Sequence, residues 1–245
     1  MSKNAKRFSK DASINTDYNV SSITSAFGYN KWELTKEQKQ LGNVMIDNDL
    51  VFVTGRAGCG KTSGVLYHYI KEYLNNNQSN IVVIRTPVEA GMDKIGALPS
   101  GLSEKIEPHF MPAKKILNDL LNAGKVQCDM DKRIHFKIPN FCLGDTLDDS
   151  FIIISEAQQI PPMIMKLLLE RIGKRSKCIV EGDPSQLYAN DGKRNGLSHS
   201  MGVFFDSDGN CKFSNRIAKF EFVEKVNQRS EVVAAVNNAY EEAGL

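Results

Sequence analysis

The stretch TGRAGCGKT limits the folds open to this chain more than any other part of the sequence. It fits the pattern G-x-x-x-x-G-K-[ST] through Gly55, Gly60, Lys61 and Thr62. The apolar run at 50–53 in front of it predicts a short buried strand, and apolar residues at helical spacing behind it predict a helix. A strand, a glycine-rich loop and a helix in this order form a phosphate-binding loop.

The chemistry of such a loop points to ATP and Mg²⁺ as ligands. Glycines let the backbone curl until its N–H groups face the phosphates, and the start of the following helix adds partial positive charge. Lys61 can neutralise phosphate oxygens, and the Thr62 hydroxyl can ligate Mg²⁺. The residues expected to contact the nucleotide are Gly55, Arg56, Ala57, Gly58, Cys59, Gly60, Lys61, Thr62 and Ser63.

The composition is that of an ordinary globular protein, with 41% hydrophobic and 24% charged residues in a chain of 245. No apolar run approaches the roughly 18–20 residues of a membrane span, and the N-terminus lacks the apolar core of a signal peptide. The five cysteines lie far apart and the four histidines are scattered, which favours reduced thiols over disulfides or a zinc site. We therefore expect a cytoplasmic protein without a membrane partner.

Residues 1–30 are rich in Ser, Asn and Lys and poor in aliphatic residues, which predicts a flexible basic leader. Such a leader could contact phosphate backbones or could be solvated surface alone, and the sequence leaves both open. Residues 31–245 are predicted to form a single domain.

Gln38 lies in the first predicted helix of this domain, which is entered through Thr35 a short distance before the phosphate-binding loop. A glutamine placed there reads adenine in several P-loop ATPases. An amide can accept a hydrogen bond from adenine N6 and donate one to N7. The alternative is that Gln38 is an ordinary surface residue of the helix.

Apolar runs alternate with helical patterns along the rest of the chain. The runs IVVIR, FIII, KCIVEG and KFEFVEKV predict strands, and SEVVAAVNNAYEEA predicts a closing helix. The alternation predicts an α/β fold, a P-loop NTPase three-layer sandwich with a mainly parallel central sheet. Residues 86–112 are expected to be largely irregular, the helix AKKILNDLLNAG to end at Gly124, and residues 189–216 to form a surface excursion.

Polar residues follow several of these strands. In a parallel sheet the ligand site gathers at the carboxyl ends of the strands. The phosphate-binding loop, Arg85, Glu156, Asp183 and Gln186 all come at such ends, so we expect them to line one cleft. Glu156 is then placed to polarise the attacking water, and Gln186 either senses the γ-phosphate or is a plain turn residue.

Ser155 departs from the expected pattern, because the residue before the catalytic glutamate is normally an aspartate that holds the water shell of Mg²⁺. A hydroxyl can bind a metal-bound water but brings no negative charge. Asp148 and Asp149 precede the strand and should lie at its far end, so Asp183 is the expected substitute. The predicted metal site is Thr62 with Ser155 or Asp183 through water, with weak Mg²⁺ affinity or slow turnover, and Ser155→Asp is expected to raise hydrolysis.

The motifs resemble those of the PhoH family of P-loop ATPases, found in bacteria and their phages. The resemblance covers the chain from roughly Trp32 to Gly244 and rests on TGRAGCGKT, RTPVEAGMDKIGALPSGLSEKIEPHFMP, TLDDSFIIISEAQQ, RIGKRSKCIVEGDPSQL and QRSEVVAAVNNAY. The family is similar to the first RecA-like domain of superfamily 1 helicases. It implies a RecA-like fold, Gln38 as the adenine-reading position, Gln186 as the sensor, and single-stranded RNA or DNA as partner.

Two arginines are candidates for the charge that stabilises the transition state. Arg229 resembles the arginine of the family's N-Q-R-S-type motif, and Arg171 lies in its R-I-G motif. Either could instead form a surface ion pair. From the length of this sequence we expect neither a second RecA-like domain nor the nuclease domain of some relatives. We therefore expect a neighbouring subunit to complete the site in a homo-oligomer such as a hexameric ring.

Two other functions compete with ATP hydrolysis coupled to nucleic acid. A nucleotide-binding switch or scaffold with negligible hydrolysis is suggested by Ser155. A small-molecule kinase is disfavoured, because no arginine-rich lid segment is visible in the sequence.

Overall fold

The computed structural model describes residues 28–87, 102–186, 195–224 and 231–242. Almost all of the predicted basic leader, and Arg229, lie outside these residues. Among the described helices, none combines the length and the apolar character that crossing a membrane requires.

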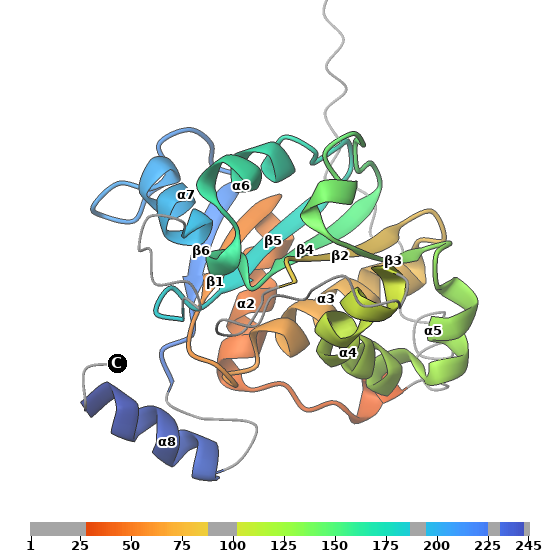
Figure 1. Cartoon of the computed structure of the whole chain (residues 1–245), viewed down its shortest axis with the longest axis horizontal. Coiled ribbons are helices and arrows are strands. Elements are labelled where there is room, and N and C mark those ends of the chain that lie inside the picture. Colours follow the sequence, from red (N-terminus) through yellow and green to blue (C-terminus); the bar gives the residue numbers. More distant parts are fainter. Residues whose placement is uncertain (1–27, 88–101, 187–194, 225–230, 243–245) are drawn as a thin grey trace, which may run out of the picture.

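A parallel sheet forms the centre of the molecule (Figure 1). Its six described strands lie in the order β3-β2-β4-β5-β1-β6, and every pairing between them is parallel. The predicted α/β class with a parallel sheet is therefore confirmed. The strands are β1 (Leu50–Thr54), β2 (Asn80–Arg85), β3 (Ile134–Lys137), β4 (Ser150–Ser155), β5 (Lys177–Gly182) and β6 (Ile217–Glu221).

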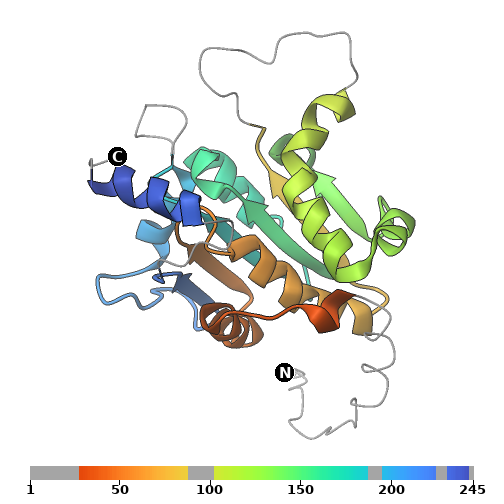
Figure 2. The same cartoon turned by 90° about the horizontal axis from the view of Figure 1, so that it is seen from below.

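Helices cover both faces of the sheet, which gives the predicted three layers. Figure 2 shows α2, α3 and α4 across one face, and Figure 1 shows α6 and α7 on the other. The helices are η1 (Gly28–Lys31), α2 (Lys36–Asp47), α3 (Lys61–Asn75), α4 (Leu102–Leu121), α5 (Ala123–Asp129), η2 (Pro139–Phe141), η3 (Ala157–Gln159), α6 (Pro162–Leu169), α7 (Gly196–Phe204) and α8 (Glu231–Glu242).

Side chains alternate between the two faces along each central strand. In β1, Val51 and Val53 pack in the core beneath α2, α3 and α4, whereas Leu50 and Phe52 pack in the core beneath α6 and α7. Because both faces are buried, the middle residues of the central strands are apolar. Polar groups are therefore confined to the two edges where the strands begin and end.

The helix α4 begins earlier than predicted, at Leu102, and contains Pro108 and Pro112. Proline inside a helix removes a backbone hydrogen bond, which is why this segment was expected to be irregular. Its apolar side chains nevertheless recur at helical spacing and pack on the core, so burial outweighs the proline cost. Those side chains are Ile106, Phe110, Ala113, Ile116, Leu117, Leu120 and Leu121.

Two other boundaries differ from the predictions. The helix α4 does not continue to Gly124 but ends at Leu121, because Asn122 takes a positive φ of 74° and caps the next helix through Lys125 N. The segment predicted as a surface excursion contains α7, whose Leu197 is fully buried against α6 and the sheet. At the C-terminal end, α8 confirms the predicted closing helix.

The packing of α4 predicts a large cost for cavity formation at Leu117, which is fully buried. Leu117→Ala is expected to lower the free energy of unfolding by about 2–5 kcal/mol, because the removed methyl groups leave a void in the core. Lys115→Ala, an exposed position on the same helix, is the matched control and should change it by less than about 0.5 kcal/mol. Chemical denaturation measures both, and equal effects would contradict the described packing.

Candidate nucleotide-binding site

The carboxyl ends of β1, β2, β4 and β5 meet around one cleft of about 400 Å³. The structure brings the phosphate-binding loop together with Arg85, Glu156, Asp183 and Gln186, as the sequence predicted. The lining residues are Ala57, Gly58, Gly60, Lys61, Thr62, Ser63, Arg85, Pro112, Ile116, Ser155, Glu156, Glu181, Gly182, Asp183 and Gln186.

The phosphate-binding loop curls around the ammonium group of Lys61. Gly58 and Gly60 have φ of 82° and 92°, backbone conformations that side chains with a Cβ rarely adopt. The Lys61 Nζ donates to the carbonyl oxygens of Gly55 (2.6 Å) and Arg56 (2.9 Å). Its positive charge is therefore held inside the loop, at the start of α3.

Gln38 lies beneath this loop and is only 1% exposed. Its Nε2 donates to Gly60 O (3.0 Å) and Ser63 Oγ (3.1 Å), and its Oε1 accepts from Thr35 N (3.0 Å). The lack of a side chain at Gly64 gives it room, since a Cβ there would lie 2.9 Å from Gln38 Cγ. Gln38 thus joins the start of α2 to the phosphate-binding loop, and adenine reading stays a prediction.

Glu156 follows β4 directly and faces the cleft in a left-handed backbone conformation (φ 53°). Non-glycine residues in this region are strained and cluster at functional sites. Its Oε2 accepts from Gln158 Nε2 (2.7 Å), and its Oε1 lies 3.7 Å from Arg85 Nη2. The buried Gln158 also accepts from Asp183 N (3.2 Å), so it ties the end of β4 to the end of β5.

Asp183 and Gln186 shape the turn after β5. The Asp183 Oδ1 accepts from Ser185 N (3.0 Å) and Ser185 Oγ (2.6 Å), so this oxygen is engaged in its own turn. The main-chain oxygen of Gln186 accepts from Gln159 Nε2 (2.7 Å). The roles of Asp183 at the metal and of Gln186 as a sensor stay predictions.

Glu181 in β5 was missed from the sequence. It is 1% exposed, its Oε1 accepts from the Thr62 hydroxyl (2.6 Å), and its Oε2 is buried without a hydrogen-bond partner among the described residues. Burial raises the pKa of this carboxyl, and the charge of Glu156 adds to the rise, while the Thr62 hydrogen bond, the charge of Lys61 and the nearby Ser155 hydroxyl oppose it. The signal was available in CIVEG, where a carboxylate ends an otherwise apolar strand.

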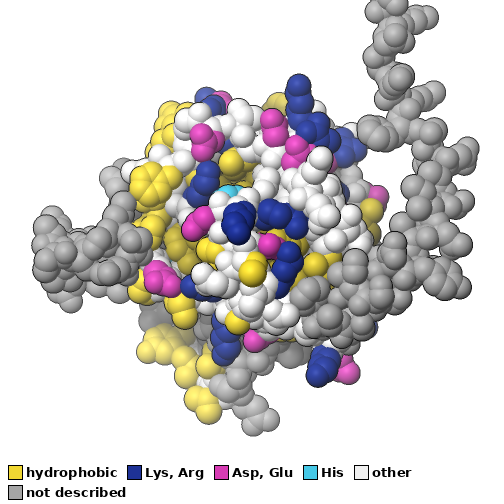
Figure 3. Space-filling view, turned by 90° about the vertical axis from the view of Figure 1, so that its right-hand side faces the viewer, with side chains coloured by type: hydrophobic (Ala, Val, Ile, Leu, Met, Phe, Trp, Pro, Cys, Tyr) yellow, Lys and Arg dark blue, Asp and Glu magenta, His cyan; other side chains and the backbone are white. Residues whose placement is uncertain are grey.

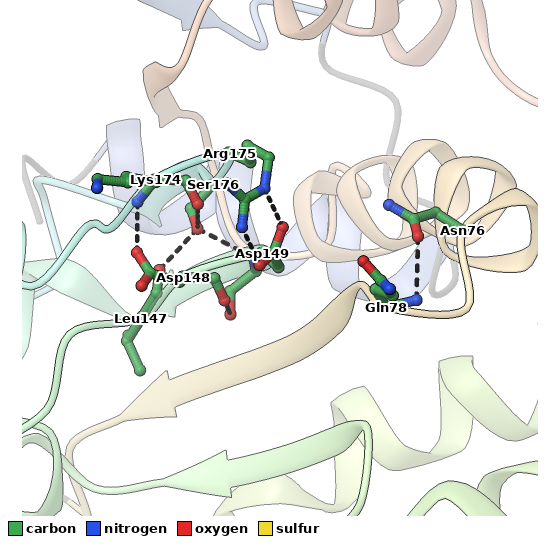
Figure 4. Close-up of polar contacts among 9 residues, drawn as sticks. Asn76, Gln78, Leu147, Asp148, Asp149, Lys174, Arg175 and Ser176 are labelled. Atoms are coloured by element: carbon green, nitrogen blue, oxygen red, sulfur yellow. Dashed lines mark hydrogen bonds and ion pairs between the residues drawn. The ribbon is translucent and has the colours of Figure 1, made fainter.

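The opposite edge of the sheet holds the acidic pair that the sequence excluded from the site (Figure 4). Asp148 Oδ1 accepts from Lys174 N (2.6 Å), and Asp149 forms an ion pair with Arg175 (2.5 Å) that lowers the pKa of Asp149. Both residues precede β4 and lie where the strands begin, so they cannot replace a carboxylate at Ser155. That expectation is confirmed.

Arg171 also lies at this opposite edge. Its main-chain oxygen accepts from Leu147 N (2.8 Å), and its Nη1 donates to Leu143 O (3.3 Å). It does not line the cleft of its own chain, and Arg229 lies outside the described residues. Arg85 is the arginine that lines the cleft among the described residues.

Lys and Arg side chains are interspersed with Asp and Glu on the side of the molecule that Figure 3 shows. Of the basic residues at 132–137, Lys132 is exposed, whereas Arg133 and Lys137 are half-buried. Lys137 pairs with Asp145 (3.1 Å). The Arg133 guanidinium lies 3.9 Å from the centre of the Tyr73 ring and donates to main-chain oxygens after α3. Lys137 and Arg133 therefore already interact with groups of their own chain, so they give little support to a nucleic-acid-binding surface here.

A family model described as PhoH-like protein matches residues 32–241. A PhoH-like protein of Bacillus subtilis is 34% identical over 208 residues, which cover 84% of this chain and 63% of that protein. Protein PhoH of Escherichia coli is 32% identical over 162 residues, which cover 65% of this chain and 46% of that protein. The chain thus spans about half to two thirds of the length of these relatives.

Solved structures give a more distant similarity. A Bacteroides Pif1 bound to single-stranded DNA is 17% identical, with a TM-score of 0.34, and the match covers 84% of this chain and 46% of that one.

The contacts of Gln38 predict that it supports the loop whichever base is bound. Gln38→Ala is expected to lower the free energy of unfolding by about 1–3 kcal/mol, because buried partners lose their hydrogen bonds. It should weaken ATP and GTP binding by similar factors. Gln40→Ala, an exposed position on the same helix, is the control and should change neither. A loss confined to ATP, measured by titration with fluorescent nucleotides, would instead indicate adenine reading.

Proposed function

The chain belongs to the PhoH family, and on that basis we propose that it binds ATP and hydrolyses it with Mg²⁺. One observation carries the proposal: the phosphate-binding loop, with Lys61 at its centre, faces the carboxylate of Glu156 across one cleft. The first group binds the phosphates and the second lies where an attacking water would be activated.

The loop supplies the phosphate site. Lys61 exchanges its contacts with the carbonyls of Gly55 and Arg56 for phosphate oxygens when the nucleotide binds. Backbone N–H groups at the start of α3 add positive potential at the same place.

The residues present fit a divalent cation beside the phosphates. The Thr62 hydroxyl and the buried Glu181 carboxylate, with its unpartnered oxygen, are the hard oxygen donors that Mg²⁺ prefers. Among the described residues no cluster of three His, Cys, Asp or Glu forms a complete cage. That agrees with Mg²⁺, which usually takes one or two protein ligands and completes its shell with phosphates and water. When bound, Mg²⁺ neutralises the charge that develops on the phosphates.

Glu156 orients the attacking water and accepts its proton. Gln158 fixes one carboxylate oxygen, and Arg85 lies near the other. Arg85 also places a positive charge in the cleft, so it joins Arg171 and Arg229 as a candidate for stabilising the transition state. Gln186 senses the γ-phosphate from the turn after β5.

Coupling to single-stranded RNA or DNA in a homo-oligomer, such as a hexameric ring, belongs to the same proposal. It derives from the family resemblance. Arg171 lies away from the cleft of its own chain, where its Nη1 donates to Leu143 O. The second candidate function is a nucleotide-binding switch with negligible hydrolysis. The proximity of Arg85 to Glu156 favours this alternative, because an ion pair competes with water for the carboxylate.

Hydrolysis by this geometry depends on the Glu156 carboxylate. Glu156→Gln is expected to reduce the rate of phosphate release by about 100-fold or more, because the amide cannot accept a proton from water. ATP affinity should change little. Glu170→Gln, an exposed glutamate outside the cleft, is the matched control. Phosphate release at the unmodified rate in Glu156→Gln would refute the assigned role.

If a neighbouring subunit supplies the arginine, ATP hydrolysis requires assembly of the oligomer. Molecular mass in solution, measured with and without ATP and Mg²⁺, should exceed that of one chain whenever hydrolysis occurs. Single-stranded RNA or DNA should increase the rate. A chain that hydrolyses ATP as a strict monomer, without response to either nucleic acid, would contradict both parts of the coupling.

A further inference from the structure

We propose that Glu181 performs the task of the aspartate that normally precedes the catalytic glutamate in ATPases of this kind. Glu181 holds the Thr62 hydroxyl and the water shell of Mg²⁺, so the carboxylate missing at Ser155 is supplied from the neighbouring strand. This inference rests on the proposed binding of ATP with Mg²⁺.

The sheet register places the two residues next to each other. The strand β5 lies between β1 and β4, and the pairing of Ile154 with Val180 puts Ser155 beside Glu181 one step further on. Val180 packs in the core beneath α6 and α7, so Glu181 points to the opposite face, toward α3 and Thr62. Compared with a carboxylate at position 155, the carboxylate of Glu181 therefore lies one strand closer to the phosphate-binding loop. It lies at the same distance from the carboxyl ends of the strands.

The contacts of Glu181 distinguish it from a structural carboxylate. Its Oε1 accepts from Thr62, the residue expected to ligate Mg²⁺. Its Oε2 is buried without a hydrogen-bond partner among the described residues, and the nearby Ser155 hydroxyl favours the charged form of the carboxyl. Burying a carboxylate oxygen without a partner is unfavourable unless a ligand completes it. Glu181 also lines the cleft, next to Thr62.

The other candidates fit less well. Ser155 carries no charge, and Asp183 Oδ1 is engaged by the backbone and side chain of Ser185. Glu181 is the carboxylate that contacts the phosphate-binding loop directly among the residues of this cleft.

The test measures metal affinity rather than turnover. Mn²⁺, a paramagnetic replacement for Mg²⁺, is titrated into the full chain with ADP or a non-hydrolysable ATP analogue, and free Mn²⁺ is read by electron paramagnetic resonance. Glu181→Gln keeps an acceptor for Thr62 but loses the charge. We expect its Mn²⁺ affinity in the nucleotide complex to fall by about 10- to 100-fold. Nucleotide affinity in EDTA and the thermal unfolding midpoint should not fall.

An exchange of the two side chains gives the sharper result. Ser155→Asp alone places two carboxylates side by side, so repulsion should prevent the gain in hydrolysis that the sequence predicted. Combined with Glu181→Gln, the same Ser155→Asp change returns one carboxylate to the usual strand and should recover most of the lost Mn²⁺ affinity. The two substitutions are therefore expected to be strongly non-additive.

Several outcomes would overturn the inference. One is an unchanged Mn²⁺ affinity in Glu181→Gln, and another is a double variant whose Mn²⁺ affinity does not recover. A third is a fall in Mn²⁺ affinity in Asp183→Asn that exceeds the fall in Glu181→Gln. A fall in thermal stability without a fall in Mn²⁺ affinity would assign Glu181 a purely structural role. If the unmodified chain binds Mn²⁺ and nucleotide through Glu181 but releases no phosphate, hydrolysis fails and this inference stands. If it binds no nucleotide, both fail.

Discussion

Parallel pairing of the strands is the constraint on which the site depends. Because every strand of the described sheet runs in the same direction, every strand ends at the same edge. Both faces are covered by helices, so polar side chains gather at the two edges where the strands begin and end. The edge where the strands begin carries the Asp149–Arg175 ion pair. The other carries the phosphate-binding loop, Glu156 and Glu181.

Buried amides hold this functional edge in shape. Gln38 ties the loop to α2 through its hydrogen bonds to Gly60 and Ser63, and Gln158 ties the end of β4 to the end of β5. Each amide contributes both donors and acceptors, so one side chain satisfies groups from two elements at once. Their burial excludes water that would compete for these bonds. The geometry of the cleft is thus set by polar contacts inside an apolar frame.

The sequence was sufficient for the fold class and for most of the cleft, because both follow from local patterns. Apolar runs mark the strands, and parallel connection brings Arg85, Glu156 and Gln186 to one edge. The start of α4 was missed, since proline argues locally against a helix while the apolar face of α4 is satisfied only by tertiary packing. Glu181 was missed for a related reason: its partner Thr62 lies 119 positions away along the chain.

The adjacency of Ser155 and Glu181 has a consequence for recognising active members of such families. A motif written along one strand requires an acidic residue at position 155 and would score this chain as degenerate. A motif written across hydrogen-bonded strands asks only for one carboxylate at that level of the sheet, on either β4 or β5. This chain meets that criterion through Glu181. Strand register could therefore separate two kinds of chain that lack the acidic residue before the catalytic glutamate. In one kind the carboxylate is absent, and in the other it stands on the neighbouring strand.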